Sequence, residues 1–565
     1  MVKLIGFDTE TVIRDRVHEF YSFQAYSEDF IKKGENINVF STDAANIELL
    51  FTNRTNRAWF VCFNLAFDGL VVARILKGME YDVKAVLAGS RMIRLTVKRG
   101  KLKWVFCDLR NILPIGNLEK VGEMLKFPKL EKPEYLGKRA PETLQEKLYF
   151  HKYAMRDAEI CFKASKMIYQ EYKTWRTTAA GLAIRVYKRD FCPIRKFKSY
   201  ESALNDKFRL AYHGGRTECL IRGVNYVKEQ TYDINSLYPY VMDSKNYPNV
   251  CKPFKNKLDV NLDYEGIAHV IVSCEHDFPP ICVKRKFDDG TDKLVFPNGK
   301  YEGWFTYPEL RTIEEHNLGK IFKVFESYEW QTSFNPFSKY VKHFYAKKEE
   351  ATKTGSPKKT MYKINLNGLY GKFGEHGACS LLVFDGENIK EIITLDAKTS
   401  WYHSVPLAAY ICAYARLENW QYLRVCEPKT MFYTDTDSFH TATDLSAYCG
   451  DKLGQLKLEK EAKIGDACYI RAKFYMINDE IKLKGFAINE KPSALRLAIY
   501  RNDFARQEHR ILKALEAKRL KQIPLTDCYI TKKFTVDDDG KREYERKLSA
   551  QDLLFSHALS KPLEI

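Results

Sequence analysis

The sequence of 565 residues contains no apolar run near the ~20 residues that a membrane-spanning helix requires. Its 14 cysteines include no Cys-x-x-Cys pair, which argues against a structural zinc site and against a disulfide framework. The N-terminus has no charged segment followed by an apolar one, so we expect no secretory signal and a reducing, cytosolic location. No internal repeat or low-complexity tract is present.

Composition and charge indicate a multidomain protein with a polyanionic partner. Hydrophobic residues make up 45% of the chain and aromatic residues 14%, which is enough for several packed cores. The formal net charge of +18 favours nucleic acid as the partner, because Lys and Arg contacts to phosphates dominate such binding. An anionic membrane surface is the competing partner.

Short strand patterns alternate with longer helical patterns through residues 1–170, which predicts an α/β unit. The expected elements are the strands Leu4–Phe7 and Trp59–Phe63, a hairpin of Met92–Val97 with Leu102–Cys107, and the helix Glu142–Ile168. The cysteines are interpreted as ordinary core residues.

The rest of the chain has an α+β pattern. Residues 255–335 are rich in turn-forming residues between short strands and predict an inserted subdomain. Residues 337–373 are helical around the turn cluster Thr354–Pro357, which predicts a helical hairpin, and residues 374–400 return to short strands. Arg506–Ile523 predicts an amphipathic basic helix whose charged face is either merely solvated or grips DNA.

A first pair of acids, Asp8 and Glu10, ends the first expected strand. Side chains at i and i+2 of a strand point to the same face, so the two carboxylates project together. Clustered acids repel one another unless a cation lies between them, and hard divalent ions such as Mg²⁺ take oxygen ligands. The pair therefore indicates a metal site.

Two later acids are expected at the same site. Asp68 follows a second strand beside Asn64, a candidate substrate ligand, while Tyr153 and Asp157 are four residues apart on one helix face. Four converging acids suit two-metal hydrolysis of a phosphodiester, with Tyr153 orienting the attacking water. Asp108 is assigned to structure.

A second set of acids is split between two strands. Asp233 ends a strand that leads into a turn, where backbone amides could cradle a triphosphate and Tyr238 would lie under the incoming sugar. Two hundred residues later, Asp435 and Asp437 occupy an acidic turn between hydrophobic runs, which predicts a hairpin that brings both carboxylates towards Asp233.

A helix between these segments carries three candidate nucleotide ligands. Lys363, Asn367 and Tyr370 are spaced i, i+4 and i+7 and share one face. They offer a cation for phosphates and a ring to stack under a base. The basic residues Lys358 and Lys359 extend this face.

These motifs, in this order, resemble those of the family B DNA polymerases, specifically the small protein-primed branch of bacteriophages, linear plasmids and related elements. The matching segments are Asp8/Glu10, Asn64/Asp68 and Tyr153/Asp157 for the exonuclease, Tyr212–Gly215 for the link to the polymerase, Asp233–Pro239, Lys363–Gly371 and Asp435–Asp437 for synthesis, and Lys473–Tyr475 for the primer strand.

The resemblance implies an RNase H-like exonuclease and a right-hand polymerase with two insertions. Its expected boundaries are 1–175 for the 3′-5′ exonuclease, 176–250 and 406–505 for the palm, 251–338 for a terminal-protein or primer-binding insertion, 339–374 for the fingers, 375–405 for a processivity and strand-displacement insertion, and 506–565 for the thumb. Asp233, Asp437 and Asp435 would hold the metal ions of synthesis, and Asp8, Glu10, Asp68 and Asp157 those of hydrolysis, as two Mg²⁺ or Mn²⁺ per site.

The resemblance also implies roles for other residues. The nucleotide would contact Ser236, Leu237, Tyr238, Lys359, Lys363, Asn367 and Tyr370. The DNA would contact Asn64, Phe67, Asn117, Leu118, Tyr212, Gly214, Gly215, Arg416, Lys473 and Tyr475. Three positions depart from the family pattern: Gly368 replaces a Ser, Asn117 a Ser or Thr, and Cys412 a Thr.

The sequence thus predicts a DNA-directed DNA polymerase with a proofreading exonuclease, using template and primer DNA, dNTPs and a terminal protein, with no membrane partner. We expect a monomer in the cytosol, of the host if the source is viral. A family B polymerase that uses ordinary primers, or none, is the alternative within the enzyme class. An inactive, polymerase-derived DNA-binding protein is the alternative outside it.

Overall fold

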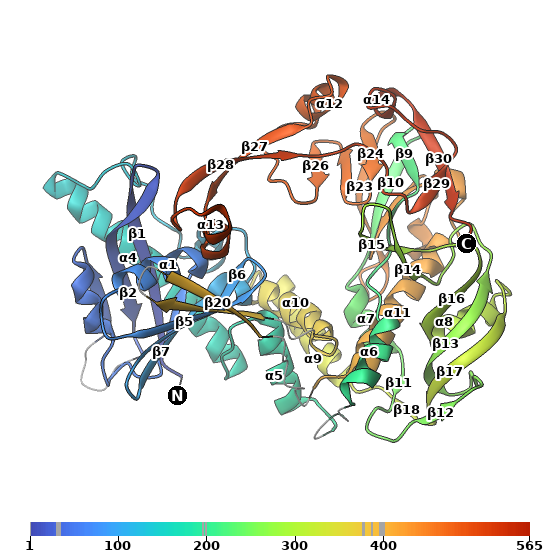
Figure 1. The fold of residues 1–565 in the computed structure, drawn as a ribbon, viewed down its shortest axis with the longest axis horizontal. Coiled ribbons are helices and arrows are strands. Elements are labelled where there is room, and N and C mark those ends of the chain that lie inside the picture. The colour runs from blue at the N-terminus through green and yellow to red at the C-terminus, as the bar shows by residue number, and fades with distance from the viewer. Residues whose placement is uncertain are drawn as a thin grey trace.

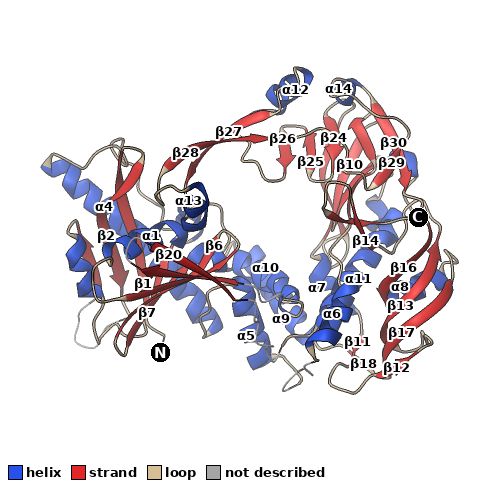
Figure 2. Cartoon of the chain, in the orientation of Figure 1, coloured by secondary structure: helices blue, strands red, loops and turns tan. Residues whose placement is uncertain are grey.

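A computed structural model describes residues 2–29, 36–194, 197, 200–375, 379–385, 388–394 and 402–565. The elements form an open ring in the view of Figure 1, with the N-terminal sheet on the left and the remaining sheets on the right. Helices α5, α9 and α10 join the two sides below, and the ribbon of β27 and β28 spans them above. Figure 2 shows helices and strands mixed in both halves, as the sequence predicts.

The N-terminal unit is built on a nine-stranded sheet in the order β20-β19-β5-β6-β7-β4-β1-β2-β3. Its strands are β1 (Leu4–Arg14), β2 (Val17–Ser27), β3 (Ile37–Ser41), β4 (Trp59–Cys62), β5 (Asp82–Ala88), β6 (Arg91–Arg99), β7 (Leu102–Asp108), β19 (Cys379–Asp385) and β20 (Asn388–Thr394). Around it lie α1 (Leu65–Ile75), α2 (Leu109–Ile112), α3 (Leu118–Met124) and α4 (Leu144–Tyr172). The predicted strands, hairpin and long helix are therefore confirmed.

One detail of this unit differs from the prediction. Strand β1 continues to Arg14, so Asp8 and Glu10 lie in mid-strand rather than at its end, because β1 pairs with β2 along almost its whole length. Asp68 follows the second expected strand, β4, as predicted, and lies in the first turn of α1.

The predicted helical hairpin forms α9 (Ser338–Lys353) and α10 (Lys358–Gly368), which pack with α5 (Ala179–Asp190). Glu171, on the last turn of α4, accepts a hydrogen bond of 2.7 Å from Lys347 on α9 and another of 2.7 Å from Lys358 on α10. These two bonds lower the pKa of Glu171 to about 2 against the opposing effect of burial. One carboxylate thus ties both helices of the hairpin to the N-terminal unit.

The other half contains a five-stranded and a six-stranded sheet. The first, in the order β23-β10-β22-β21-β8, consists of β8 (Thr217–Cys219), β10 (Glu229–Ile234), β21 (Met431–Asp435), β22 (Ser438–Thr441) and β23 (Leu456–Ala462). The second consists of β9 (Ile221–Val224), β24 (Ala467–Arg471), β25 (Phe474–Ile477), β26 (Glu480–Leu483), β29 (Arg542–Tyr544) and β30 (His557–Pro562). The neighbouring helices are α6 (Ser202–Leu210), α7 (Leu237–Ser244), α11 (Val405–Leu423), α12 (Pro492–Tyr500) and α14 (Asp552–Phe555).

The expected inserted subdomain follows α7. It contains a four-stranded sheet of β12 (Lys255–Lys257), β13 (Glu265–Cys274), β16 (Gly299–Thr306) and β17 (Ile321–Trp330), and one helix, α8 (Tyr307–Glu315). The short pairs β11 (Tyr247–Pro248) with β18 (Ser333–Phe334) and β14 (Val283–Lys286) with β15 (Asp292–Val295) complete it.

The expected helix over Arg506–Ile523 is wrong in its first part. Residues Ala505–Ile511 form strand β27, which pairs antiparallel with β28 (Asp527–Lys533), and only α13 (Ala514–Leu520) is helical. A partner strand some twenty residues later in the chain overrides the local helical spacing.

Parts of the expected second insertion, residues 376–378, 386–387 and 395–401, lie outside the described residues. Strands β19 and β20 belong to this segment, and β19 pairs with β5, so the hairpin extends the N-terminal sheet. Most cysteines in the described part of the chain are buried, as expected of core residues. Within the same ranges, every helix is too short or too polar to cross a bilayer.

Two candidate active sites

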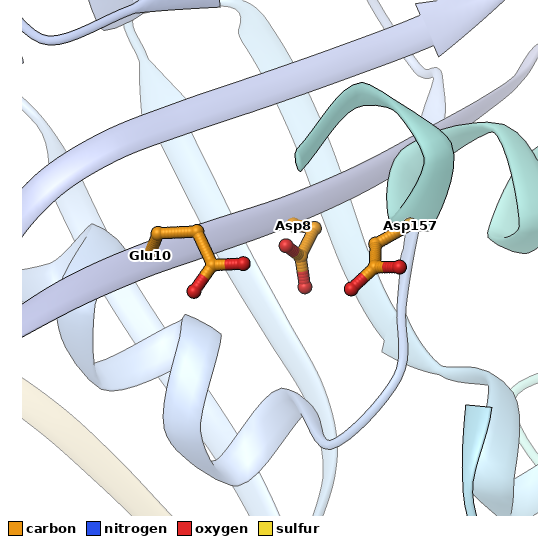
Figure 3. A group of neighbouring side chains, drawn as sticks. All are labelled: Asp8, Glu10 and Asp157. Carbon is orange, nitrogen blue, oxygen red and sulfur yellow. The ribbon is translucent and has the colours of Figure 1, made fainter. Parts of the chain in front are cut away.

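Three carboxylates of the first predicted set meet at the centre of the N-terminal unit. Atoms of Asp8, Glu10 and Asp157 lie within 4.8 Å of one another. Figure 3 shows the two β1 side chains directed towards Asp157, which projects from α4. Strand alternation places Asp8 and Glu10 on the face that α4 covers, so two elements far apart in sequence build one acidic cluster.

The electrostatics of this cluster fit a divalent cation. Burial, followed by repulsion from Asp68, Glu10 and Asp157, holds the pKa of Asp8 well above its usual range. Burial and the charge of Asp157 raise the pKa of Glu10 to about 8. Oδ1 of Asp157 is buried without a hydrogen-bond partner. Carboxylate oxygens that are held close together despite their mutual repulsion are typical ligands of Mg²⁺ or Mn²⁺.

The fourth predicted acid, Asp68, lies beside this group rather than in it. Its Oδ1 accepts hydrogen bonds from the backbone N–H of Thr9 (3.0 Å) and from the Thr9 hydroxyl (2.7 Å). Burial nevertheless raises the pKa of Asp68 to about 7. Asp108 accepts bonds from the backbone N–H groups of Asn64 and Leu65 and so caps α1, which confirms its structural role.

Lys129 belongs to the first site, and the sequence motifs did not reveal it. Its ammonium lies 2.6 Å from Oδ2 of Asp157 and 5.1 Å from the centre of the Tyr153 ring. It lowers the pKa of both Asp157 and Glu10, against the larger effect of burial. Lys129 occupies an irregular segment without a spacing pattern, so only its neighbours in space identify it.

The other residues predicted to bind the strand under hydrolysis lie on α1 and α3 of the N-terminal unit, or directly before these helices. Asn64 adopts a left-handed backbone conformation (φ 83°) at the start of α1. The Phe67 ring makes an edge contact with His18 at 5.3 Å. The side chain of Asn117 accepts a hydrogen bond from Lys120 N and caps α3, and Leu118 is buried. In the structure, Asn117 therefore caps a helix and Leu118 belongs to the hydrophobic core.

The second acid set meets on the five-stranded sheet. Asp233 lies opposite Ser438 in the β10–β22 register, and Ile234 N donates to the carbonyl of Asp437 at 2.7 Å. Burial, followed by the charge of Asp437, raises the pKa of Asp233 to about 7. Burial also raises the pKa of Asp437 to about 6. This pair, too, has the charge pattern of a divalent-metal site.

Asp435 is engaged differently from the other two acids. Its Oδ1 accepts hydrogen bonds from Lys473 Nζ (2.6 Å) and from the Thr217 hydroxyl (3.0 Å). The backbone N–H of Lys473 also donates a hydrogen bond to the phenol oxygen of Tyr433 (2.9 Å), and the Tyr433 ring lies 4.8 Å from that of Tyr475. The predicted primer-strand residues thus contact the acidic turn itself.

The predicted nucleotide-binding side chains face this acid pair. The rings of Tyr238 and Tyr370 are stacked at 4.0 Å with an angle of 7° between them. The positive charge of Lys363 lowers the pKa of Asp233, against the effect of burial, so α10 presents its cation to the acids. Lys359, Lys363 and Asn367 are exposed, while Leu237 is buried and supports α7.

Lys348 was missed by the sequence analysis. It lies on α9, and its Nζ donates to the hydroxyl of Ser236 at 3.3 Å. Burial and the nearby charges of Lys363 and Lys359 lower its pKa. The half-buried Lys348 and the exposed Lys359 and Lys363 together form a group of ammonium ions that suits a polyphosphate.

The loop Tyr212–Gly215 touches the acidic turn, and only glycine fits at its end. A Cβ at Gly215 would lie 2.6 Å from the hydroxyl oxygen of Thr436, whose backbone has a positive φ of 61°. Gly214 has open space around its Cα, and the Tyr212 ring lies against Gly374.

Arg416 has a different role from the predicted DNA contact. Its side chain is fully buried, and its guanidinium lies 2.7 Å from the carboxylate of Glu309 on α8. It also donates to the carbonyls of His213 (2.7 Å) and Gly214 (3.0 Å). Because no part of the guanidinium is exposed, Arg416 positions the Tyr212–Gly215 loop instead of touching a ligand.

The departures from the family pattern are accommodated locally. The thiol of Cys412 is buried and forms a hydrogen bond with Tyr238. A Cβ at Gly368 would lie 3.5 Å from the Cα of Ala180, which is an ordinary contact distance. The space beside Gly368 is therefore neither too small for a Cβ nor a large cavity.

Comparison with known proteins agrees with this geometry. Residues 138–378 match the family described as DNA polymerase type B, organellar and viral. A probable DNA polymerase of Podospora anserina is 25% identical over 497 residues, covering 70% of this chain and 40% of that protein. The DNA polymerase of Streptococcus phage Cp-1 is 26% identical over 453 residues, covering 74% of this chain and 77% of that protein.

The solved structure of Phi29 DNA polymerase complexed with primer-template DNA and incoming nucleotide substrates has a similar fold. The TM-score is 0.75 at 17% identity, over 95% of this chain and 100% of that one. The chain spans less than half the length of the Podospora protein and of its counterpart from Neurospora intermedia. By sequence and by fold, the chain is therefore a relative of the organellar and viral type B DNA polymerases.

Proposed function

We propose that the protein is a DNA-directed DNA polymerase with a separate 3′-5′ exonuclease site. The observation that carries the proposal is the pairing of Asp233 with Asp437 beside Lys363 and the stacked rings of Tyr238 and Tyr370. In synthesis, a primer 3′-hydroxyl attacks the α-phosphate of a dNTP, a new phosphodiester bond forms, and pyrophosphate leaves. Lysine charges above the acids offset the negative charge of the triphosphate.

The acid pairs supply the ligands for divalent ions in both sites. Asp233 and Asp437 would hold them for synthesis, and Asp8, Glu10 and Asp157 for hydrolysis. When bound, such ions lower the pKa of the attacking hydroxyl or water and stabilise the leaving oxygen. The chain's own residues orient the reactants: Tyr238 and Tyr370 hold the nucleotide, and Tyr153 with Lys129 borders the place of the attacking water.

The test separates the two sites. Asp437→Ala should abolish Mg²⁺-dependent incorporation of a labelled dNTP and leave hydrolysis of single-stranded 3′ ends intact. The double variant Asp8→Ala/Glu10→Ala should do the reverse. Survival of either activity in its own knockout would show that the acids are assigned to the wrong reactions. Loss of both activities in a folded single-site variant would contradict the separation of the sites.

The starting hydroxyl is proposed to come from a protein. The inserted subdomain, residues 251–338, has a hydrophobic core of its own, and the resemblance of the sequence motifs to the protein-primed branch supports this proposal. The Mg²⁺-dependent transfer of a labelled dNMP to a candidate partner protein tests it. Extension only of ordinary oligonucleotide primers would favour a polymerase that starts from such primers. The mostly buried cysteines support action in a reducing cytosol, and we propose that the protein acts as a monomer.

A further inference from the structure

The four-stranded sheet of the inserted subdomain has one covered face and one open face. Ala268, Val270 and Phe305 point towards α8 and form a core with Leu310 and Ile313. Because strand side chains alternate, their neighbours point to the opposite face. Helix α6 covers only one end of that face, where Phe208 packs on Tyr328 and Trp330. The sheet lies at the right of Figure 1.

The open face carries rings on three adjacent strands. His269 on β13 stacks parallel to Trp304 on β16, with centroids 5.0 Å apart and an angle of 2° between the rings. On its other side, His269 stacks on Phe325 of β17 at 4.7 Å. Phe322, also on β17, is 45% exposed.

Lysine ammonium groups cover the outward ring faces. Lys300 lies 4.0 Å and Lys320 lies 5.0 Å from the centre of the Phe322 ring, and Lys323 lies 4.4 Å from that of Phe325. Among the described residues, none of these three lysines has a carboxylate partner within salt-bridge distance. The acids nearby are already engaged: Glu302 by His269 at 2.8 Å, and Glu326 by Lys207 at 2.7 Å. The surface is therefore aromatic and net positive.

We infer that this face binds a single-stranded segment of DNA. A single strand offers unpaired bases and phosphates, and this surface offers the exposed ring of Phe322 and the half-buried ring of Phe325 beside three ammonium groups. Base stacking on aromatic side chains combined with lysine contacts to phosphates is the chemistry of sequence-independent single-strand binding. A bound base would displace an ammonium from a ring face, and that ammonium would then pair with the adjacent phosphate. The inference rests on the proposed polymerase function for the identity of the polymer.

The position of the face suits a strand that also reaches the second site. Lys207 of α6 bonds both Glu326 and Tyr328 of β17, so α6 is fastened to the edge of the face. The chain leaving α6 leads directly into Tyr212 and Gly214, the predicted template contacts. A strand crossing the open face would therefore continue along one covalent segment towards the acids.

Two fluorescently labelled probes of equal length, oligo(dT) and an abasic oligodeoxynucleotide, test the inference with the full chain in EDTA, which prevents hydrolysis. Phe322→Ala and Phe322→Leu should weaken oligo(dT) binding roughly 5- to 100-fold and leave abasic binding unchanged, because only the base uses the ring. Lys300→Gln/Lys320→Gln should weaken both probes and reduce the salt slope by about 1.4, at about 0.7 for each lost phosphate contact.

Matched controls have the same chemistry elsewhere. Leu258→Ala removes a side chain that is 78% exposed in the same subdomain, and Lys98→Gln/Lys101→Gln removes two exposed lysines of the N-terminal unit. If the Phe322 variants and the lysine variant behave like these controls, the face serves sheet stability or a protein partner, and the inference is overturned. An unchanged ratio of oligo(dT) to abasic affinity in both Phe322 variants would also overturn it. The same preparations are also assayed for incorporation of dNTPs. If they incorporate dNTPs but the binding tests fail, only the inference about this face is wrong, and the proposed polymerase function stands.

Discussion

The ion pair between Glu309 and Arg416 connects the inserted subdomain to the loop at the second active site. Both side chains are completely buried, and their charged atoms lie 2.7 Å apart. Glu309 also accepts hydrogen bonds from the N–H (3.0 Å) and the hydroxyl (2.8 Å) of Thr306, which closes a capping box at the start of α8. The guanidinium holds the carbonyls of His213 and Gly214. Glu309 therefore orients Arg416, and Arg416 in turn orients the loop Tyr212–Gly215.

Glu309→Ala should cost about 3–5 kcal/mol in the free energy of unfolding, because it leaves the guanidinium of Arg416 buried without a counter-charge. Glu309→Gln keeps the capping geometry and should cost less. In the apolar double variant Glu309→Leu/Arg416→Met no charge is left unpaired, so much of the loss should be regained. Recovery should be incomplete by about 1–3 kcal/mol, since two buried carbonyls lose their donor.

Urea unfolding of the purified variants measures these differences, and primer extension beside hydrolysis of a single-stranded 3′ end measures the functional consequence. Extension should fall in Glu309→Ala, because Arg416 loses the carboxylate that orients it, and in the double variant, because the donor to the loop itself is gone. Hydrolysis should persist in both. Glu302→Ala is the matched control: its side chain is 55% exposed and pairs with His269, so its loss should cost less than about 1 kcal/mol. A cost below 1 kcal/mol for Glu309→Ala would refute the reasoning.

Three further changes test other parts of the structure. Tyr238→Val should raise ribonucleotide incorporation roughly 10- to 100-fold in primer extension by removing the ring stacked on Tyr370, and unchanged sugar discrimination would contradict the role of the ring. Gly215→Ala should cost about 1–3 kcal/mol in unfolding free energy because of its clash with Thr436, whereas Gly214→Ala, with open space, should be tolerated; equal costs would be inconsistent with the close approach. Burial raises the pKa of Glu229 to about 8 from its ordinary 4.5, so this group's contribution to stability is complete below pH 4.5 and is lost as the pH rises through 8. Glu229→Gln should flatten the fall of the melting temperature between pH 4.5 and about 8, and an equally steep fall in the variant would point to other groups.

Residues that act through local spacing could be predicted from the sequence. Asp8 and Glu10 share a strand face at i and i+2, and the hairpin of α9 and α10 turns where Gly355 and Pro357 interrupt a helical pattern. In both cases the relevant neighbours are a few residues apart. This strand and this helical hairpin could therefore be predicted from the spacing of hydrophobic residues and from the turn-forming residues alone.

Residues that act through distant neighbours could not be predicted in the same way. Lys129 has no motif of its own and becomes part of the first site only because α4 brings Asp157 to within 2.6 Å. Arg416 matched a family position, but its burial depends on Glu309, more than a hundred residues earlier in the chain. The spacing of Ile511 and Leu515 fitted a helix, yet pairing with β28 made residues 505–511 a strand.

The N-terminal unit is also the anchor for two segments of the other half. At one edge of its sheet, β5 pairs with β19, and Leu382 enters the same hydrophobic core. At the other side, Val17 forms a bridge with Thr526, and Ala514 and Leu525 from the β27–β28 ribbon join that core.

Each anchor combines backbone pairing with buried apolar contact, so the two segments are held as parts of the unit and not as loose neighbours. An excised fragment of residues 1–175 would leave β5 as an edge strand paired with β6 alone, and would expose the apolar surface that covers Ala514 and Leu525. The N-terminal unit and the other half of the chain are consequently one structural entity. Activity measurements on the first site therefore require the full chain, since truncation changes the packing of the sheet that positions Asp8 and Glu10.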